Sequence, residues 1–188
     1  MDLKSHLARI VVDADAIRAR VRELGEQITR DFRAAGADEI TVISITNGAV
    51  LFAADLLREL DLPVRLDCVR AANYRDETKP VTRTEIIDQI RLDISGTHTL
   101  LIDDVMATGR TLRKLVGILE EMKPANLRTC VLLEKPSCRV ETTSADYTGF
   151  AIGQEFVVGY GLDFAERYRN LPCIGTLRPE LQNPPTWC

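Results

Sequence analysis

Alternation of strand-like and helix-like segments is the feature that most constrains how this chain can fold. The strand-like segments are short, apolar and rich in β-branched residues, and amphipathic segments with helical spacing lie between them. The predicted strands are 39–46, 64–71, 98–105, 127–135 and 155–162, and the predicted helices are 13–35, 49–60 and 111–122. Because each helix returns the chain to the start of the next strand, this order predicts a mainly parallel sheet flanked by helices. We therefore expect an α/β fold in a single domain.

Two segments fall outside this alternation. Residues 75–88 are polar, contain Pro80 and show no clear period, which predicts a long loop or a loose hairpin. The tail 178–188 is rich in proline, and we expect it to run over the surface with Trp187 as a candidate anchor.

Composition excludes several classes of function. The chain has 188 residues, enough to bury a sizeable core. Its net charge is −4 and it has no dense basic run, which disfavours nucleic acid as the main partner. No apolar stretch approaches the roughly 20 residues of a membrane span, and the N-terminus lacks the apolar core of a secretion signal. We therefore expect no membrane partner and a cytoplasmic location.

Cysteine and histidine usage argues against a metal cluster and against a disulfide framework. The five cysteines are odd in number and include no Cys-x-x-Cys pair, which is typical of reduced thiols. With only His6 and His98 available, a histidine-based zinc site is disfavoured.

Polar residues gather at or just past the ends of the predicted strands. They are Asn47-Gly48, Asp103-Asp104, Lys135 and Asp163. In open parallel sheets the ligand crevice lies outside the carboxyl ends of the strands. The sequence therefore predicts one site that is built from these four places.

The stretch TLLIDDVMATGRTL, residues 99–112, carries most of the chemical information. Adjacent side chains on an extended strand diverge, so Asp103 and Asp104 can reach different groups of one ligand. In the loop 107–111, Gly109, two threonine hydroxyls and the free N–H groups of a helix start can form an anion cradle. A phosphorylated sugar with Mg²⁺ suits both features. For the Asp-Asp pair and the Thr-Gly alone, a capped turn remains an open alternative.

This stretch resembles the phosphoribosyl-pyrophosphate (PRPP) binding motif of type I phosphoribosyltransferases. LLEKPSCR at 132–139 and the segment 146–177 resemble the C-terminal half of hypoxanthine-guanine phosphoribosyltransferases, and the resemblance extends across nearly the whole chain. It implies Mg²⁺-dependent conversion of hypoxanthine or guanine plus PRPP to IMP or GMP plus pyrophosphate. It also implies a core at about 38–165, a hood from about 1–15 and 150–188, and a homodimer or homotetramer.

The resemblance further implies roles for individual residues. Asp103 and Asp104 would contact the ribose hydroxyls, and Asp163 would bind Mg²⁺ near pyrophosphate. The 5′-phosphate would be held by the loop residues Ala107, Thr108, Gly109, Arg110 and Thr111. Pyrophosphate would be held by Asn47, Gly48 and Arg169. The purine would be held by Lys135 at its 6-oxygen, Phe156 by stacking, Val157 through its backbone, and Asp163, which also belongs to the predicted purine site. Asn73 and Tyr74 would begin a lid that excludes water. Each residue alone has an ordinary interpretation as core, turn or surface, and only their joint spacing favours these roles.

The chain departs from the family pattern at three positions. Asn47 stands where the family has lysine, Asn73 where it has serine, and Ala107 where it has an aspartate that takes the purine proton. General-base assistance typically supplies about 10²–10⁴-fold in rate. Another carboxylate or a water could take the proton, substrate preference could have shifted, or the protein could bind nucleotide without useful turnover. The alternatives to a working enzyme are a nucleotide-binding regulator and a low-activity homologue or partner subunit on the same fold.

Overall fold

A six-stranded sheet forms the centre of the molecule. The computed structural model describes residues 2–75, 82–86 and 90–182. The strand order is β4-β3-β2-β5-β6-β7, and β3, β2, β5, β6 and β7 run parallel while β4 runs antiparallel to β3. The strands are β2 (Ile40–Thr46), β3 (Val64–Arg75), β4 (Thr82–Ile86), β5 (His98–Met106), β6 (Asn126–Glu134) and β7 (Tyr147–Ala151). The predicted mainly parallel sheet is confirmed.

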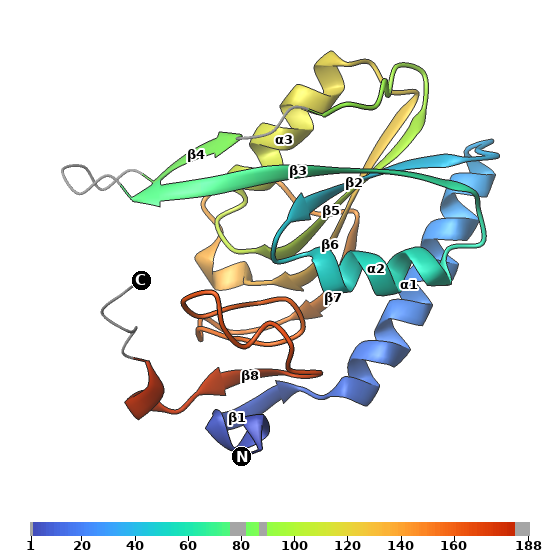
Figure 1. The fold of residues 1–188 in the computed structure, drawn as a ribbon. Coiled ribbons are helices and arrows are strands. Elements are labelled where there is room, and N and C mark those ends of the chain that lie inside the picture. Colours follow the sequence, from blue (N-terminus) through green and yellow to red (C-terminus); the bar gives the residue numbers. More distant parts are fainter. Residues whose placement is uncertain (1, 76–81, 87–89, 183–188) are drawn as a thin grey trace.

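Helices cover both faces of this sheet (Figure 1). Helices α1 (Ala14–Ala34) and α2 (Val50–Glu59) pack together on one face, and α3 (Arg110–Glu121) covers the other. The crossover from β2 to β3 therefore lies on one face and the crossover from β5 to β6 on the opposite face. Because β2 and β5 are neighbours, their carboxyl ends form the point where the winding direction reverses, and a crevice opens there in such sheets.

The predicted helix at 13–35 matches α1, and its local sequence explains both ends. The carboxylate of Asp13 caps the helix by accepting the N–H of Ala16 at 2.8 Å. Ile17, Val21 and Leu24 recur at helical spacing and are buried against the sheet. Gly36, with φ +84°, follows the last turn, where a left-handed residue is favoured.

A small second sheet joins segments from the two ends of the described chain. Strand β1 (Leu7–Val12) follows the short 3₁₀ helix η1 (Leu3–His6) and pairs antiparallel with β8 (Ile174–Leu177) (Figure 1). Two further 3₁₀ turns are η2 (Pro136–Cys138) and η3 (Pro179–Leu181). The short core beneath this sheet includes Leu7, Val158, Leu171 and Leu177.

The predicted strand at 155–162 is wrong. Gly159 and Gly161 adopt φ values of +101° and +100°, and Tyr160 between them has φ +50°. A left-handed backbone cannot continue an extended strand, so the segment forms only isolated bridges within a looped structure. The fifth parallel strand is instead β7 at 147–151, which the sequence analysis missed. Consequently Asp163 is reached from a loop and not, as predicted, from a strand end.

The segment 75–88 was predicted as a loop or a loose hairpin, and its described part is a hairpin arm. β3 extends to Arg75 and pairs with β4, with Asn73 opposite Thr84 and Tyr74 opposite Arg83. Residues 76–81, 87–89 and Trp187 lie outside the described residues.

Two composition-based expectations can be compared with the described residues. Among the described residues, Cys68, Cys130, Cys138 and Cys173 are free thiols. None of the helices described here is both long enough and apolar enough to cross a lipid bilayer.

The Asp67 carboxylate fastens the segment before β5 to the edge of the sheet. It accepts the backbone N–H groups of Cys68 at 2.8 Å, Arg91 at 2.6 Å and Leu92 at 3.0 Å. Burial raises the pKa of Asp67, but these donors outweigh burial and hold the pKa below its ordinary value.

We predict that Asp67→Ala lowers the free energy of unfolding by about 1–2 kcal/mol at pH 7, because three N–H groups lose a charged acceptor. A group with a lowered folded-state pKa stabilises fully above its unfolded pKa of about 3.9. The difference between wild type and variant should therefore shrink as the pH falls from about 3.9 through the folded-state pKa. Urea titrations at several pH values measure it. Asp67→Asn, which keeps one carbonyl oxygen, should lose less, and equal losses at all pH values would contradict this role.

Candidate active site

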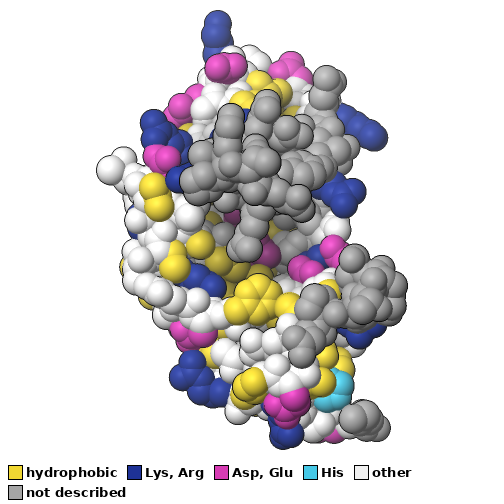
Figure 2. Space-filling model, turned by 90° about the vertical axis from the view of Figure 1, so that its left-hand side faces the viewer, with side chains coloured by type: hydrophobic (Ala, Val, Ile, Leu, Met, Phe, Trp, Pro, Cys, Tyr) yellow, Lys and Arg dark blue, Asp and Glu magenta, His cyan; other side chains and the backbone are white. Residues whose placement is uncertain are grey.

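A polar cavity of about 350 Å³ lies at the carboxyl ends of β2 and β5. In Figure 2 this side of the molecule is hollowed, and hydrophobic, acidic and basic side chains meet in the hollow. Seven of the residues predicted from sequence line the cavity, which are Asn47, Gly48, Asp103, Asp104, Thr111, Asp163 and Arg169. The structure thus brings together residues that lie up to 122 positions apart in the chain.

Asp103 and Asp104 lie within β5, which continues two residues beyond them. Asp103 is buried and accepts the N–H of Asp104 at 2.9 Å, and Asp104 accepts the N–H of Val105 at 2.8 Å. Neither carboxylate forms an ion pair with a cation among the described residues. Both therefore remain available to a ligand, which is what binding of a diol requires.

Burial dominates the electrostatics of this acidic pair. It raises the pKa of Asp103 well above its ordinary range, and the neighbouring charge of Asp104 raises it further. Burial also raises the pKa of Asp104, while its hydrogen bonds and the positive charge of Arg169 act in the opposite direction. Two acids held this way bind hydroxyl donors or a cation strongly, since either ligand relieves the cost of burying charge.

The turn after β2 packs directly on Asp104. A Cβ atom at Gly48 would lie 1.7 Å from Oδ2 of Asp104, so no side chain larger than hydrogen fits there. A Cβ atom at Gly161 would lie 2.1 Å from the carbonyl oxygen of Gly48. The peptide bond between Thr46 and Asn47 is cis. Glycine at positions 48 and 161 therefore allows the turn, the acid and the 159–169 loop to meet at one place.

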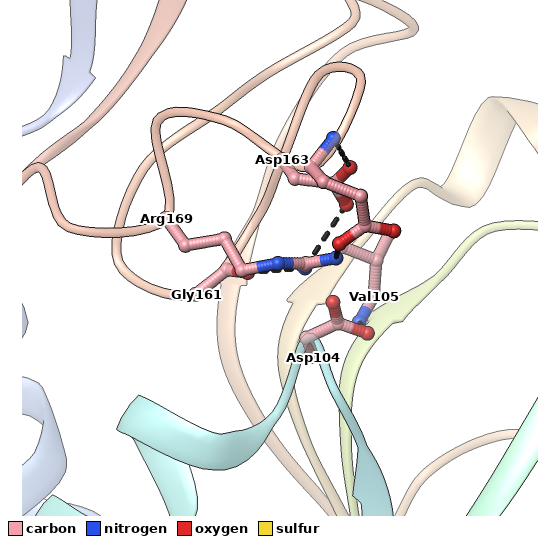
Figure 3. A network of polar contacts seen from close by, with 6 residues as sticks. Asp104, Val105, Gly161, Asp163 and Arg169 are labelled. Atoms are coloured by element: carbon pink, nitrogen blue, oxygen red, sulfur yellow. Dashed lines mark hydrogen bonds and ion pairs between the residues drawn. The ribbon is translucent and has the colours of Figure 1, made fainter. Parts of the chain in front are cut away.

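Arg169 is held by three acceptors on its own loop (Figure 3). Its Nη1 donates to the carbonyl oxygen of Gly161 at 2.8 Å and lies 3.0 Å from Oδ1 of Asp163. Its Nη2 lies 2.7 Å from Oε2 of Glu166. Asp163 in turn accepts the N–H of Glu166 at 2.9 Å. This network holds the guanidinium group above Asp104.

The loop predicted to hold phosphate is braced from behind. The carbonyl oxygen of Thr108 accepts the N–H groups of Val140 at 3.2 Å and Glu141 at 3.1 Å. Gly109, with φ +82°, is the residue before α3. Only Thr111 of this loop lines the cavity, whereas Ala107, Thr108, Gly109 and Arg110 lie beyond it toward the 136–143 segment.

Of the residues predicted to bind the purine, Asp163 lines the cavity, whereas Lys135, Phe156 and Val157 do not. The N–H of Lys135 donates to the carbonyl oxygen of Met106 at 2.9 Å, and its Nζ donates to the carbonyl oxygen of Glu155 at 2.7 Å. Phe156 is 58% exposed, while its neighbour Val157 is buried. A lysine ammonium next to an exposed aromatic ring makes a platform that is suited to a planar base with a carbonyl group.

The two predicted lid residues are only partly described. Asn73 and Tyr74 belong to the β3–β4 hairpin, which begins three residues after Arg70 at the cavity wall. Their side chains lie outside the described part of the chain.

Sequence reasoning missed several residues of the site, among them two with charged side chains and one aromatic residue. Arg70 and Glu166 line the cavity, and Phe164 meets Phe156 edge to face with ring centroids 5.9 Å apart. Arg70 could have been found by aligning the carboxyl ends of the parallel strands, because it pairs in register with Thr46. The looped course of 159–169, which positions Glu166 and Phe164, left no periodic signal in the sequence.

Magnesium fits the side chains at this site. Among the described residues no group of three or more His, Cys, Asp or Glu side chains forms an all-protein cage. Mg²⁺ rarely uses such a cage and binds one or two carboxylates together with substrate phosphates and water. The cavity offers carboxylate oxygens from Asp104 and Asp163 and excludes sulfur and imidazole ligands.

The family model and the relatives that match this chain agree on one protein family. A model of the phosphoribosyl transferase domain matches residues 10–165. The hypoxanthine-guanine phosphoribosyltransferase of Streptococcus pneumoniae is 37% identical over 179 residues, which cover 95% of this chain and 98% of that protein. The hypoxanthine phosphoribosyltransferase of Haemophilus influenzae is 36% identical over 173 residues, which cover 92% and 97%.

A solved structure agrees with these relatives. The hypoxanthine phosphoribosyltransferase of Trypanosoma cruzi, in complex with the product IMP, superposes with a TM-score of 0.87 at 32% identity and covers 96% of this chain and 99% of that one. The chain belongs to the phosphoribosyltransferase family and, within it, to the hypoxanthine-guanine phosphoribosyltransferases.

Proposed function

We propose that this protein transfers the phosphoribosyl group of PRPP to hypoxanthine or guanine and releases pyrophosphate, forming IMP or GMP. The observation that carries the proposal is the cavity that is lined by the Asn47-Gly48 turn, by Arg169, and by a buried and a half-buried acid, Asp103 and Asp104, without a partner cation among the described residues. Relatives named for this activity are 36–37% identical over nearly the full chain, which supports the same conclusion.

The carboxylates would hold the sugar. Asp103 and Asp104 would accept hydrogen bonds from the two ribose hydroxyls, because both face the cavity and lack a protein cation among the described residues. Ala107, Thr108, Gly109, Arg110 and Thr111 would bind the 5′-phosphate through N–H and hydroxyl donors at the start of α3. Holding the sugar at both ends aligns its C1 atom for displacement, which is a proximity effect.

A second set of cavity residues would hold the leaving group, pyrophosphate. Backbone N–H groups at Asn47-Gly48 and the guanidinium of Arg169 would bind pyrophosphate. Asp163, with Asp104 nearby, would hold Mg²⁺, which supplies charge neutralisation to the departing oxygens. These groups act mainly by electrostatic stabilisation, which is most effective when the donors are fixed before reaction, as Arg169 is.

Lys135, Phe156 and Val157 would hold the purine. The ammonium of Lys135 would move from the carbonyl oxygen of Glu155 to the 6-oxygen of the base, and the exposed face of Phe156 would stack on the ring. Lys135 is joined through its N–H to Met106, the residue before Ala107, so the base would lie next to position 107.

No carboxylate at position 107 takes the purine proton. The acids that contact this region through described residues are themselves paired, Glu134 with Arg139 and Glu141 with Arg113. A solvent water would therefore accept the proton, and the rate would lack the contribution of a positioned base.

A product assay is the direct test of this function. Purified protein with PRPP and Mg²⁺ should form IMP from hypoxanthine and GMP from guanine, detected by chromatography. Asp104→Asn should lower kcat/KM by at least about tenfold, because a neutral amide replaces an acceptor of the ribose hydroxyl. Nucleotide binding without product from any purine would instead indicate a regulator on this fold.

Gly48→Ala tests the close packing between the turn and Asp104. The new Cβ atom would meet Oδ2 of Asp104 at 1.7 Å, so either group must move by an ångström or more. We expect kcat/KM to fall by about 10²-fold with little change in melting temperature. The matched control is Gly117→Ala in α3, where no heavy atom lies within 4 Å of the new Cβ atom. It should leave kcat/KM unchanged and stabilise the helix by about 1 kcal/mol. If Gly48→Ala kept wild-type kinetics, the close packing of the turn on Asp104 would not be needed for activity.

Ala107→Asp tests the missing base. A carboxylate next to the Met106–Lys135 contact should raise kcat for hypoxanthine or guanine by about tenfold or more, while KM for PRPP changes little. Ala107→Asn, which has the same shape but is no base, should show no gain. An unchanged kcat with every 6-oxopurine in Ala107→Asp would show that proton removal does not limit the rate.

A further inference from the structure

The charged side chains that line the cavity are mostly acidic, and pyrophosphate, which we propose binds at Asn47-Gly48 and Arg169, is negatively charged as well. Of the described residues that line the cavity, four carry carboxylates, Asp103, Asp104, Asp163 and Glu166, and two carry guanidinium groups, Arg70 and Arg169. Pyrophosphate is a polyanion, and Asn47 at the turn carries no charge. A wall with this balance binds the leaving group well only if its cations are free to contact it.

Arg169 is only partly free. Its guanidinium already contacts the carbonyl oxygen of Gly161 and the carboxylates of Asp163 and Glu166. Two carboxylates neutralise its charge before any ligand arrives. Arg169 can therefore present N–H donors in a fixed orientation, but it supplies little net positive charge to the site.

Arg70 has the opposite character. It is exposed and lines the same cavity, and its side chain forms no hydrogen bond or ion pair with any residue that the structure describes. It pairs in register with Thr46, the last residue of β2. Neighbouring strands lie about 4.8 Å apart, so Arg70 starts beside the Asn47-Gly48 turn. Its long side chain can reach any group that is bound on that turn.

We propose that Arg70 binds pyrophosphate and supplies the positive charge that the Asn47-Gly48 turn lacks. The guanidinium fork matches phosphate oxygens with two parallel hydrogen bonds, and its charge assists both. This inference rests on the proposed function and adds to it a binding residue from β3. Arg70 from β3 and Arg169 from the 159–169 loop, which both line the cavity, would then hold the leaving group together.

Arg70→Ala is the first test. Charge-assisted hydrogen bonds contribute about 1.5–3 kcal/mol, so KM for PRPP and the inhibition constant of Mg²⁺-pyrophosphate should each rise at least about tenfold. Inhibition by IMP or GMP, which carry no pyrophosphate, should change less than about twofold. Arg70→Lys keeps the charge but not the fork and should fall between wild type and Arg70→Ala.

Arg65→Ala is the matched control. Arg65 lies five residues earlier on β3, about 16 Å along the strand, and does not line the cavity. Its removal changes the net charge of the protein by the same amount and should leave all three constants unchanged. An equal effect of both variants would overturn the proposal in favour of a general effect of net charge.

A second variant tests whether the charge itself is what Arg70 contributes. Asn47→Lys in the Arg70→Ala background should recover most of the lost pyrophosphate affinity, while the same change in wild type should gain less. Such unequal effects define a coupling energy between the two positions. Equal effects in both backgrounds would mean that Arg70 and position 47 act on different ligands.

The remaining outcomes separate this inference from the proposed function. If wild type forms nucleotide and Arg70→Ala keeps wild-type constants for PRPP and pyrophosphate, the inference alone is wrong. If wild type neither forms nucleotide nor binds pyrophosphate, the proposed function is wrong and the inference with it. Equal loss of nucleotide and pyrophosphate binding in Arg70→Ala would also overturn the inference, since it indicates damage to the site as a whole.

Discussion

The contact between Gly48 and Asp104 is the constraint on which the rest of the site depends. The chain passes from β2 into its turn at the place where β5 carries Asp103 and Asp104, and a Cβ atom at Gly48 would clash with the Asp104 carboxylate. Gly161 then brings the third segment onto the carbonyl oxygen of Gly48. Strand order produces this meeting, since α2 and α3 return the chain on opposite faces and leave the carboxyl ends of β2 and β5 uncovered.

Packing the turn after β2, the end of β5 and the 159–169 loop against one another raises the electrostatic free energy of the folded state. Asp103 is buried, and its pKa is raised both by burial and by the charge of Asp104. The described protein offers these acids backbone N–H groups but no ion pair. A buried charge without a counter-ion destabilises a fold, and such costs persist where the group serves a ligand. The ribose hydroxyls and Mg²⁺ that we propose would relieve this cost only when they bind. The free energy that folding spends on burying these charges would therefore be recovered in part when the ligand binds.

The sequence predicted those parts of the fold that depend on local periodicity. α1, α2, α3 and four of the parallel strands follow from apolar spacing and capping, as Asp13 illustrates. The error at 155–162 has a physical cause, because its apolar pattern suits a strand while Gly159 and Gly161 turn the backbone left-handed. β7 was missed because a five-residue strand with a central glycine has too little pattern. Within the site, the two acids and the 107–111 loop were found from residue type and spacing, whereas the roles of the other residues came from the resemblance to the family. Arg70 was not found, because its relevance comes from register with Thr46 on another strand.

The contacts around position 107 explain why Ala107 does not by itself decide whether the protein is an enzyme. Position 107 follows Met106, whose carbonyl oxygen accepts the N–H of Lys135, so the proposed phosphate loop and the proposed base-binding residues are joined by a hydrogen bond. An aspartate there would add a proton acceptor to a frame that is already complete without it. The braced carbonyl of Thr108 and the fixed guanidinium of Arg169 do not depend on the residue at 107. Alignment and electrostatic stabilisation therefore survive its loss, and these usually contribute more to the rate than a general base does.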